Sequence, residues 1–204
     1  MSEGTYTFVY WGLSHPNFAI QMNSGHYLVS DYGNNRIIEL DFTLLVPLVR
    51  SYIMAGVVYF DYSEANETLL IASETLNIVR EVTWSDMDFG TTIWQSSYSL
   101  NSPQCATYKK GDTTNIVIAD IGNGRIVKCN RTSNAYESLD YYRLDSDDTS
   151  TVHEISSFYK PYRVFQYADG NICVVEQEGR PIDFGTLESS SSSSTEVRSS
   201  SSSI

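Results

Sequence analysis

Short runs of apolar and β-branched residues alternate along the chain with turn-forming residues, and this pattern predicts strands rather than helices. The segment "HYLVSDYGNNRIIELD" predicts a strand His26–Ser30, a turn around Tyr32–Asn35 and a second strand Arg36–Asp41. A Gly-Asn turn between two β-prone runs is typical of a β-hairpin. Because no long amphipathic helical pattern competes with such segments, the sequence predicts an all-β fold.

The same hairpin pattern recurs along the chain. "TNIVIADIGNGRIVKCN" (114–130) repeats Asp-x-Gly-Asn-x-Arg-Ile, and its Asp120 follows Asp31 by 89 residues. "TLLIASETLNIVREV" (68–82) has the same outline with Ser73 or Glu74 in place of the Asp, and "GNICVVEQEGRPIDF" (170–184) has it with Glu176 and Arg180. The first three units follow one another at intervals of roughly 42–47 residues, which is the spacing of a four-stranded propeller blade.

Further strands are predicted on both sides of each hairpin. A short strand precedes each one, in three cases shortly after a proline, and would be the innermost strand of its unit. A candidate outer strand follows each of the first three hairpins, whereas the fourth has none. The predicted inner strands lie within 14–22, 56–63, 101–109 and 159–167, and the predicted outer strands within 44–53, 91–100 and 137–144.

The two Asp-x-Gly-Asn-x-Arg-Ile segments, with His15-Pro16 before the first of them, resemble NHL repeats over roughly residues 12–184. The resemblance implies a β-propeller, and the four visible units predict about four blades, fewer than the six common in that family. The propeller is expected in residues 1–186, followed by a Ser-rich tail in 187–204. We expect the N-terminal strand 6–11 to close the last blade by pairing with residues 180–185, because this would hide two sheet edges. The expected units span about 12–53, 56–100, 101–144 and 159–184.

The repeated motif residues are predicted to be structural. We expect the glycines to supply the positive φ of a tight turn, and each aspartate to cap the turn through its own backbone. We expect each arginine to form a charge-assisted bond either with the aspartate of the motif or with a carboxylate of a neighbouring blade. These residues are Asp31, Gly33, Asn34, Arg36, Asp120, Gly122, Asn123 and Arg125.

Composition restricts the partners. The chain has 25 Asp and Glu against 13 Lys and Arg, a formal charge of -12, which argues against nucleic acid and anionic membranes as partners. No run of about 18 apolar residues predicts membrane insertion. The 15 Tyr residues suit a protein or glycan partner. The Ser-rich tail and the acidic composition favour a location outside the cell or on a virion. The sequence is also compatible with self-assembly.

The sequence contains candidate glycosylation sites and one candidate calcium site. The candidate glycosylation sites are Asn66 and Asn130, which lie in acceptor sequences, and Ser189 and Ser199 in the tail. The interval between the third and fourth hairpins widens to 56 residues near "DSDDTSTVHE" (145–154). Its Asp145, Asp147, Asp148 and Glu154 are weak candidates for a calcium site, but their spacing fits no EF-hand. A solvated acidic loop without a metal is the favoured interpretation.

The sequence favours a noncatalytic protein without a cofactor. His15, His26 and His153 do not share one repeat position, which disfavours a three-histidine zinc site, and the three cysteines are expected to be buried free thiols. We therefore predict an NHL-like binding or structural module on a Ser-rich stalk. The alternatives are a propeller lyase or hydrolase with a metal near His15 at the central channel, and a subunit of a filament or coat.

Overall fold

The computed structural model describes residues 12–109, 112–138, 141–145, 148–155, 161–166, 172–176 and 181–184. These residues form antiparallel strands and two single-turn 3₁₀ helices, η1 (Tyr32–Asn34) and η2 (Ile121–Asn123). The predicted all-β class is confirmed. No described helical segment has the length and apolar character needed to cross a bilayer.

Three sheets have four strands each in simple sequential order, and a fourth sheet has three described strands. The first contains β1 (Pro16–Gln21), β2 (Tyr27–Asp31), β3 (Arg36–Leu40) and β4 (Leu48–Ile53). The second contains β5 (Val57–Ser63), β6 (Thr68–Ser73), β7 (Ile78–Trp84) and β8 (Phe89–Gln95). The third contains β9 (Pro103–Lys109), β10 (Asp112–Asp120), β11 (Arg125–Asn130) and β12 (Ala135–Ser138). The fourth contains β15 (Pro161–Gln166), β16 (Ile172–Glu176) and β17 (Pro181–Phe184).

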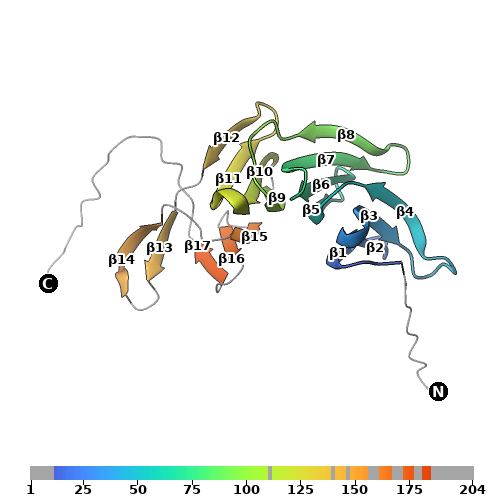
Figure 1. The fold of residues 1–204 in the computed structure, drawn as a ribbon, viewed down its shortest axis with the longest axis horizontal. Coiled ribbons are helices and arrows are strands. Elements are labelled where there is room, and N and C mark those ends of the chain that lie inside the picture. The colour runs from blue at the N-terminus through green and yellow to red at the C-terminus, as the bar shows by residue number, and fades with distance from the viewer. Residues whose placement is uncertain are drawn as a thin grey trace, which may run out of the picture.

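The sheets follow one another around a common centre, and their first strands β1, β5, β9 and β15 face it (Figure 1). Burial differs between strands of one sheet: in the second sheet all six residues of β6 are buried, whereas most of β8 is exposed. Apolar side chains pack between neighbouring sheets, with Phe60 and Leu28 in the core of the first pair and Ile118 and Val164 in a core that joins the third and fourth. The sheets are therefore held together face to face by hydrophobic burial.

The four hairpins keep one register. Each inner strand begins opposite the last residue of the second strand, and the pairing shifts before the third residue of the inner strand. Three of the four first residues are proline, which suits the start of a strand because it donates no hydrogen bond. The pairs are Pro16 with Asp31, Val57 with Ser73, Pro103 with Asp120, and Pro161 with Glu176. Ser73, rather than Glu74, thus occupies the aspartate position.

The predicted reason for the repeat glycines is wrong. The left-handed turn residues are Asn35 (φ 52°) and Gly124 (φ 59°), not Gly33 or Gly122. A Cβ on Gly33 would lie 2.7 Å from the backbone oxygen of Ser14. A Cβ on Gly122 would lie at the same distance from the backbone oxygen of Asn101, in the equivalent loop. Glycine is needed there because the loop before the inner strand passes against the turn, so the constraint is close approach.

The insertion before the fourth sheet is a β-hairpin rather than the expected acidic loop. β13 (Tyr141–Asp145) pairs antiparallel with β14 (Asp148–Ile155). The β-branched residues of "DTSTVHEI" favour a strand, which outweighs the acidic composition. The outer strand predicted within 137–144 is accordingly divided between β12 and β13, which belong to different sheets.

Several expectations fall outside the described residues. They are the N-terminal strand 6–11 and its pairing with 180–185, Asp147, Arg180, and the Ser-rich tail 187–204 with Ser189 and Ser199.

Candidate functional site at the central channel

Side chains from all four sheets meet at the centre. The third residue of each inner strand occupies one register level, and these residues are Phe18, Tyr59, Cys105 and Arg163. The guanidinium carbon of Arg163 lies 4.6 Å from the Tyr59 ring centroid and 5.6 Å from that of Phe18. The two rings are 4.4 Å apart, and the Cys105 thiol donates to the Val164 carbonyl oxygen at 3.6 Å. We call these four residues the channel cluster, because their side chains contact one another where the four inner strands converge.

A second network lies beside the channel cluster, toward the repeat turns. The hydroxyl of Tyr32 and the side-chain amide of Gln104 both donate to the carboxylate of Glu74. Arg163 Nη1 donates to the backbone carbonyl oxygen of Gln104 at 3.3 Å. The hydrogen bond to Glu74, with its negative charge, raises the pKa of Tyr32. This network links residues of all four repeat units and leaves Glu74 paired to protein groups.

The ionisable groups of the channel cluster are in unreactive forms. Burial raises the pKa of Cys105 to about 12, and burial also raises the pKa of Tyr59. At neutral pH both groups keep their protons, so neither the thiolate nor the phenolate that nucleophilic or base catalysis requires is formed. The positive charge of Arg163 faces aromatic rings, which stabilise it through cation–π contacts.

Asp61 is the acidic group closest in sequence to the channel cluster, two residues after Tyr59 on β5. Its Oδ2 accepts hydrogen bonds from Thr107 Oγ1 at 2.8 Å and from the Tyr108 backbone N–H at 2.9 Å. Burial nevertheless raises the pKa of Asp61, because desolvation outweighs these donors. A carboxyl group with a raised pKa is the feature of this region that most resembles a functional site.

We expect Asp61→Asn to stabilise the protein at neutral pH. Because the folded-state pKa is raised, the native protein holds more protons than the unfolded chain, and stability falls as pH rises through the folded pKa. Asparagine keeps an acceptor oxygen without the desolvated charge. Urea unfolding should show the variant's advantage at pH 7 and a smaller one below the ordinary pKa of aspartate. A variant less stable than wild type at pH 7 would mean that the charge has a favourable partner.

The motif residues form a separate structural arrangement at each turn. Asp120 accepts from the Asn101 backbone N–H at 2.7 Å, and from Asn123 Nδ2 and Arg125 Nε at 2.8 Å each. Asp31 makes the same three bonds, with Ser14, Asn34 and Arg36 as donors. The predicted pairing of arginine with aspartate is therefore present in both copies. The expected capping is wrong, since neither aspartate side chain caps its own 3₁₀ turn; each holds the loop before the inner strand.

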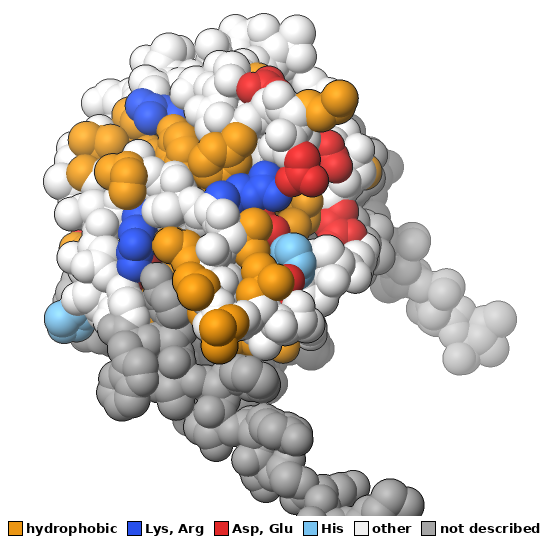
Figure 2. Space-filling view, turned by 90° about the vertical axis from the view of Figure 1, so that its right-hand side faces the viewer, with side chains coloured by type: hydrophobic (Ala, Val, Ile, Leu, Met, Phe, Trp, Pro, Cys, Tyr) orange, Lys and Arg blue, Asp and Glu red, His pale blue; other side chains and the backbone are white. Residues whose placement is uncertain are grey.

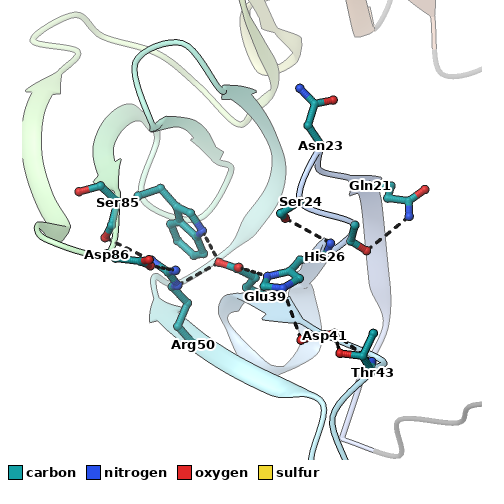
Figure 3. Close-up of polar contacts among 12 residues, drawn as sticks. Gln21, Asn23, Ser24, His26, Glu39, Asp41, Thr43, Arg50, Ser85 and Asp86 are labelled. Atoms are coloured by element: carbon teal, nitrogen blue, oxygen red, sulfur yellow. Dashed lines mark hydrogen bonds and ion pairs between the residues drawn. The ribbon is translucent and has the colours of Figure 1, made fainter.

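The sequence interpretation did not identify a buried glutamate at the junction of the first two sheets (Figure 3). Glu39, 2% exposed, accepts from Trp84 Nε1 at 2.8 Å and pairs with Arg50 Nε at 2.9 Å and His26 Nδ1 at 2.7 Å. Glu81 occupies the equivalent position on β7, and the Tyr108 hydroxyl donates to it at 2.8 Å. The available signal was a glutamate in the fourth position of two apolar third strands, "RIIEL" and "IVREV".

The other predicted residues do not join the channel cluster. His15 is exposed and contacts Ser14, while His26 pairs with Glu39 and Asp41. Asn66 is exposed in the turn between β5 and β6, and Asn130 ends β11. Among the residues whose placement is described, no group of three or more His, Cys, Asp or Glu could hold a metal ion. As expected, the cysteines are buried and free: Cys105, Cys129 and Cys173.

Comparison with solved structures decides the fold. The β-propeller domain of Cps50 (Swd1) from Myceliophteria thermophila matches with a TM-score of 0.62 at 11% identity over 85% of this chain and 54% of that one. An auxiliary nutrient binding protein from Bacteroides thetaiotaomicron matches with a TM-score of 0.59 at 13% identity over 83% and 47%. Virginiamycin B lyase from Staphylococcus aureus matches with a TM-score of 0.50 at 12% identity over 83% and 69%. The chain has a β-propeller fold.

The propeller fold alone does not identify a family or an activity. Neither a protein-family model nor a curated protein sequence matches the chain. At these identities the likeness concerns the fold, and the matched propellers range from binding proteins to a lyase. The chain spans about half the length of these solved structures, 54% of the Cps50 propeller domain and 47% of the nutrient binding protein.

Proposed function

We propose that the chain is a noncatalytic, NHL-like β-propeller that binds a macromolecular partner, and that the Ser-rich segment carries it as a stalk outside the cell or on a virion. Two features support this proposal. The ionisable side chains Tyr59 and Cys105 of the channel cluster are held in protonated forms by burial. Large apolar side chains are exposed on the β3–β4 and β7–β8 loops.

The exposed loops carry the argument. Leu45 (101% exposed) and Val46 (70%) lie in the loop between β3 and β4, and Met87 (99%) lies in the loop between β7 and β8. Arg50, on β4 after the first loop, contacts the second loop, since it pairs with Asp86 and donates to the Ser85 carbonyl oxygen at 3.2 Å. Figure 2 looks onto this side of the molecule, where hydrophobic side chains lie around basic and acidic groups. We call Leu44, Leu45, Val46 and Met87 the loop surface.

A partner protein explains the loop surface better than solvent does. Apolar side chains that are this exposed contribute favourable free energy when a partner covers them. Asp86, 89% exposed, adjoins Met87, so a partner with apolar and basic residues would complement the surface. Self-association is disfavoured by the formal charge of -12, which two copies would share.

The test compares Leu45→Ser/Met87→Ser with wild type and with Ile93→Ser, a control that removes an exposed apolar side chain from β8. All three should melt alike. Quantitative affinity capture from the native source should recover a protein with wild type and the control but not with the double variant. Equal capture by the double variant would contradict the proposal. Sedimentation showing large assemblies of the chain alone would favour the filament or coat alternative.

A lyase or hydrolase remains the second candidate, because the raised pKa of Asp61 beside the channel is typical of catalytic carboxyl groups. If this alternative holds, an activity lost in Asp61→Asn should be found while the fold is unchanged.

A further inference from the structure

The loops at the end of the first two sheets that carries the loop surface are acidic. They join the first strand to the second and the third to the fourth, and they span 22–26, 41–47, 64–67 and 85–88. They contain no Lys or Arg, and their acidic residues are Asp41, Glu64, Glu67, Asp86 and Asp88. The corresponding loops of the third sheet, 110–111 and 131–134, contain Lys110 and Arg131 and no acidic residue. Negative charge is therefore concentrated in the two sheets that carry the loop surface.

Hydrogen bonds connect two of these acidic loops to their neighbours. The backbone N–H and the side-chain amide of Asn23 both donate to the carboxylate of Glu64, which joins the first turns of the two sheets. The Trp84 backbone N–H donates to the Glu67 carbonyl oxygen at 2.7 Å. Glu64 and Glu67 are both exposed. Their turn therefore lies beside the start of the loop that carries Met87.

A chain of ion pairs links the other two loops (Figure 3). It runs from the first loop to the second through Asp41, His26, Glu39, Arg50 and Asp86. His26 Nε2 lies 3.4 Å from Asp41 Oδ2. The guanidinium of Arg50 is shared by two carboxylates, those of Glu39 and Asp86. Negative charge is left over, so this side of the molecule favours cationic partners.

The same charges act on a nearby tyrosine. Burial raises the pKa of Tyr62, and the negative charges of Glu64, Glu67 and Glu39 raise it further, although the charge of Arg50 opposes them. Carboxylates from both sheets therefore contribute to one negative potential at the end of β5.

The apolar tips are held in fixed turns. Asp41 Oδ1 accepts hydrogen bonds from the Thr43 backbone N–H at 2.9 Å and from Thr43 Oγ1 at 2.7 Å. The Asp41 backbone N–H donates to the Pro47 carbonyl oxygen at 2.8 Å. In the other loop, Ser85 Oγ accepts from the Asp88 backbone N–H at 3.0 Å. Such turns fix the backbone of the loop surface, so a partner that covers it orders little further chain.

Exposed apolar tips among carboxylates restrict the kind of partner. Nucleic acid and anionic membranes carry phosphates, which the carboxylates repel. The partner must instead present apolar and cationic side chains together. A helix does so when apolar residues recur at i, i+3, i+4 and i+7 and Lys or Arg occupy the flanking positions. Met87 suits such a helix, because a flexible thioether side chain adapts to irregular apolar contacts.

We infer that the loop surface binds a basic amphipathic helix of a partner protein. The apolar stripe of the helix covers Leu45 and Met87, and its Lys or Arg side chains pair with the surrounding carboxylates. This inference rests on the proposed function, because it takes the loop surface as the binding site and adds the chemistry of the partner.

The probe is a synthetic peptide of two Leu-Lys-Lys-Leu-Leu-Lys-Leu heptads, titrated into the ¹⁵N-labelled full chain. Amide resonances of 44–46 and 85–88 should shift saturably. The affinity should fall about tenfold or more between about 50 mM and about 500 mM salt, because salt screens exposed charges. A peptide with Glu in place of Lys, and one with Gln in place of Leu, should each bind at least about tenfold more weakly.

Variants of the chain separate the apolar from the charged contribution. Leu45→Ser/Met87→Ser should weaken binding of the Lys peptide about tenfold or more. Glu67→Gln/Asp86→Asn keeps the apolar tips, and it should weaken binding about fivefold and reduce its salt dependence. Glu137→Gln is the matched control, since it removes a carboxylate from β12 in the third sheet and should bind as wild type does. All of these variants should melt alike, because the replaced side chains are exposed.

Several outcomes would overturn the inference: no saturable shift in 44–46 and 85–88, unchanged affinity in Leu45→Ser/Met87→Ser, or equal binding of the Glu peptide. Binding of phosphatidylcholine vesicles in place of the peptide, or a dimer that Leu45→Ser/Met87→Ser abolishes, would also overturn it. If a captured partner stays bound in about 500 mM salt while the peptide does not bind, the inference fails and the proposed function stands. Equal capture by wild type and Leu45→Ser/Met87→Ser would instead contradict the proposed function.

Discussion

Asp120→Ala is expected to destabilise the protein by about 3 kcal/mol, more than the loss of its partner Arg125. The aspartate is fully buried and accepts three hydrogen bonds, from the Asn101 backbone, Asn123 and Arg125. Its removal leaves three donors without their acceptor and frees the loop that leads into β9. Urea unfolding at neutral pH measures the loss.

The comparison with Arg125→Ala makes this prediction specific. Asp120 then keeps two of its donors, so the expected loss is smaller, about 1–3 kcal/mol. Asp31→Ala should behave like Asp120→Ala because Asp31 makes the same three bonds. Asp88→Ala, in an exposed turn, serves as a surface control. Unchanged melting of Arg125→Ala would contradict a structural role for the motif.

Arg50→Met is expected to cost about 3 kcal/mol, because it removes the guanidinium that neutralises Glu39 at the junction of the first two sheets. Glu39 is only 2% exposed, so water cannot replace the lost partner. Methionine retains most of the apolar stem of Arg50 but loses the guanidinium, whose carbon lies 6.0 Å from the Trp84 ring centroid and 5.4 Å from that of Phe89, so the change mainly reports the charge. The free energy of unfolding in guanidinium chloride gives the cost.

A second substitution separates charge from packing. In Arg50→Met/Glu39→Gln the buried group is neutral and still accepts from Trp84, so part of the lost stability should return. Arg80→Ala is the matched control, since Arg80 donates to Gln95 on the exposed side of β8. If the double variant is less stable than Arg50→Met, the charge of Glu39 is not the cause of the loss.

The repeat itself could be predicted from the sequence. Asp31 and Arg36 are five residues apart and face each other across one hairpin, so a local pattern is enough to predict their pairing. The alternation of β-prone runs with turns likewise gave the four hairpins and the inner strands before them. These features depend on neighbours in sequence, and the propeller class follows from their period.

Contacts between distant segments were decided only by the tertiary structure. Gly33 looked like a turn residue, but its constraint is a loop that begins near Ser14 and passes within 2.7 Å of it. Arg163 meets Phe18 and Tyr59 because four inner strands converge, although nothing near Arg163 in sequence indicates an aromatic partner. Glu39 has Trp84 as its donor for the same reason. A periodic sequence specifies which face of each strand is apolar, but the side chain that covers a given buried charge depends on how the sheets pack against one another.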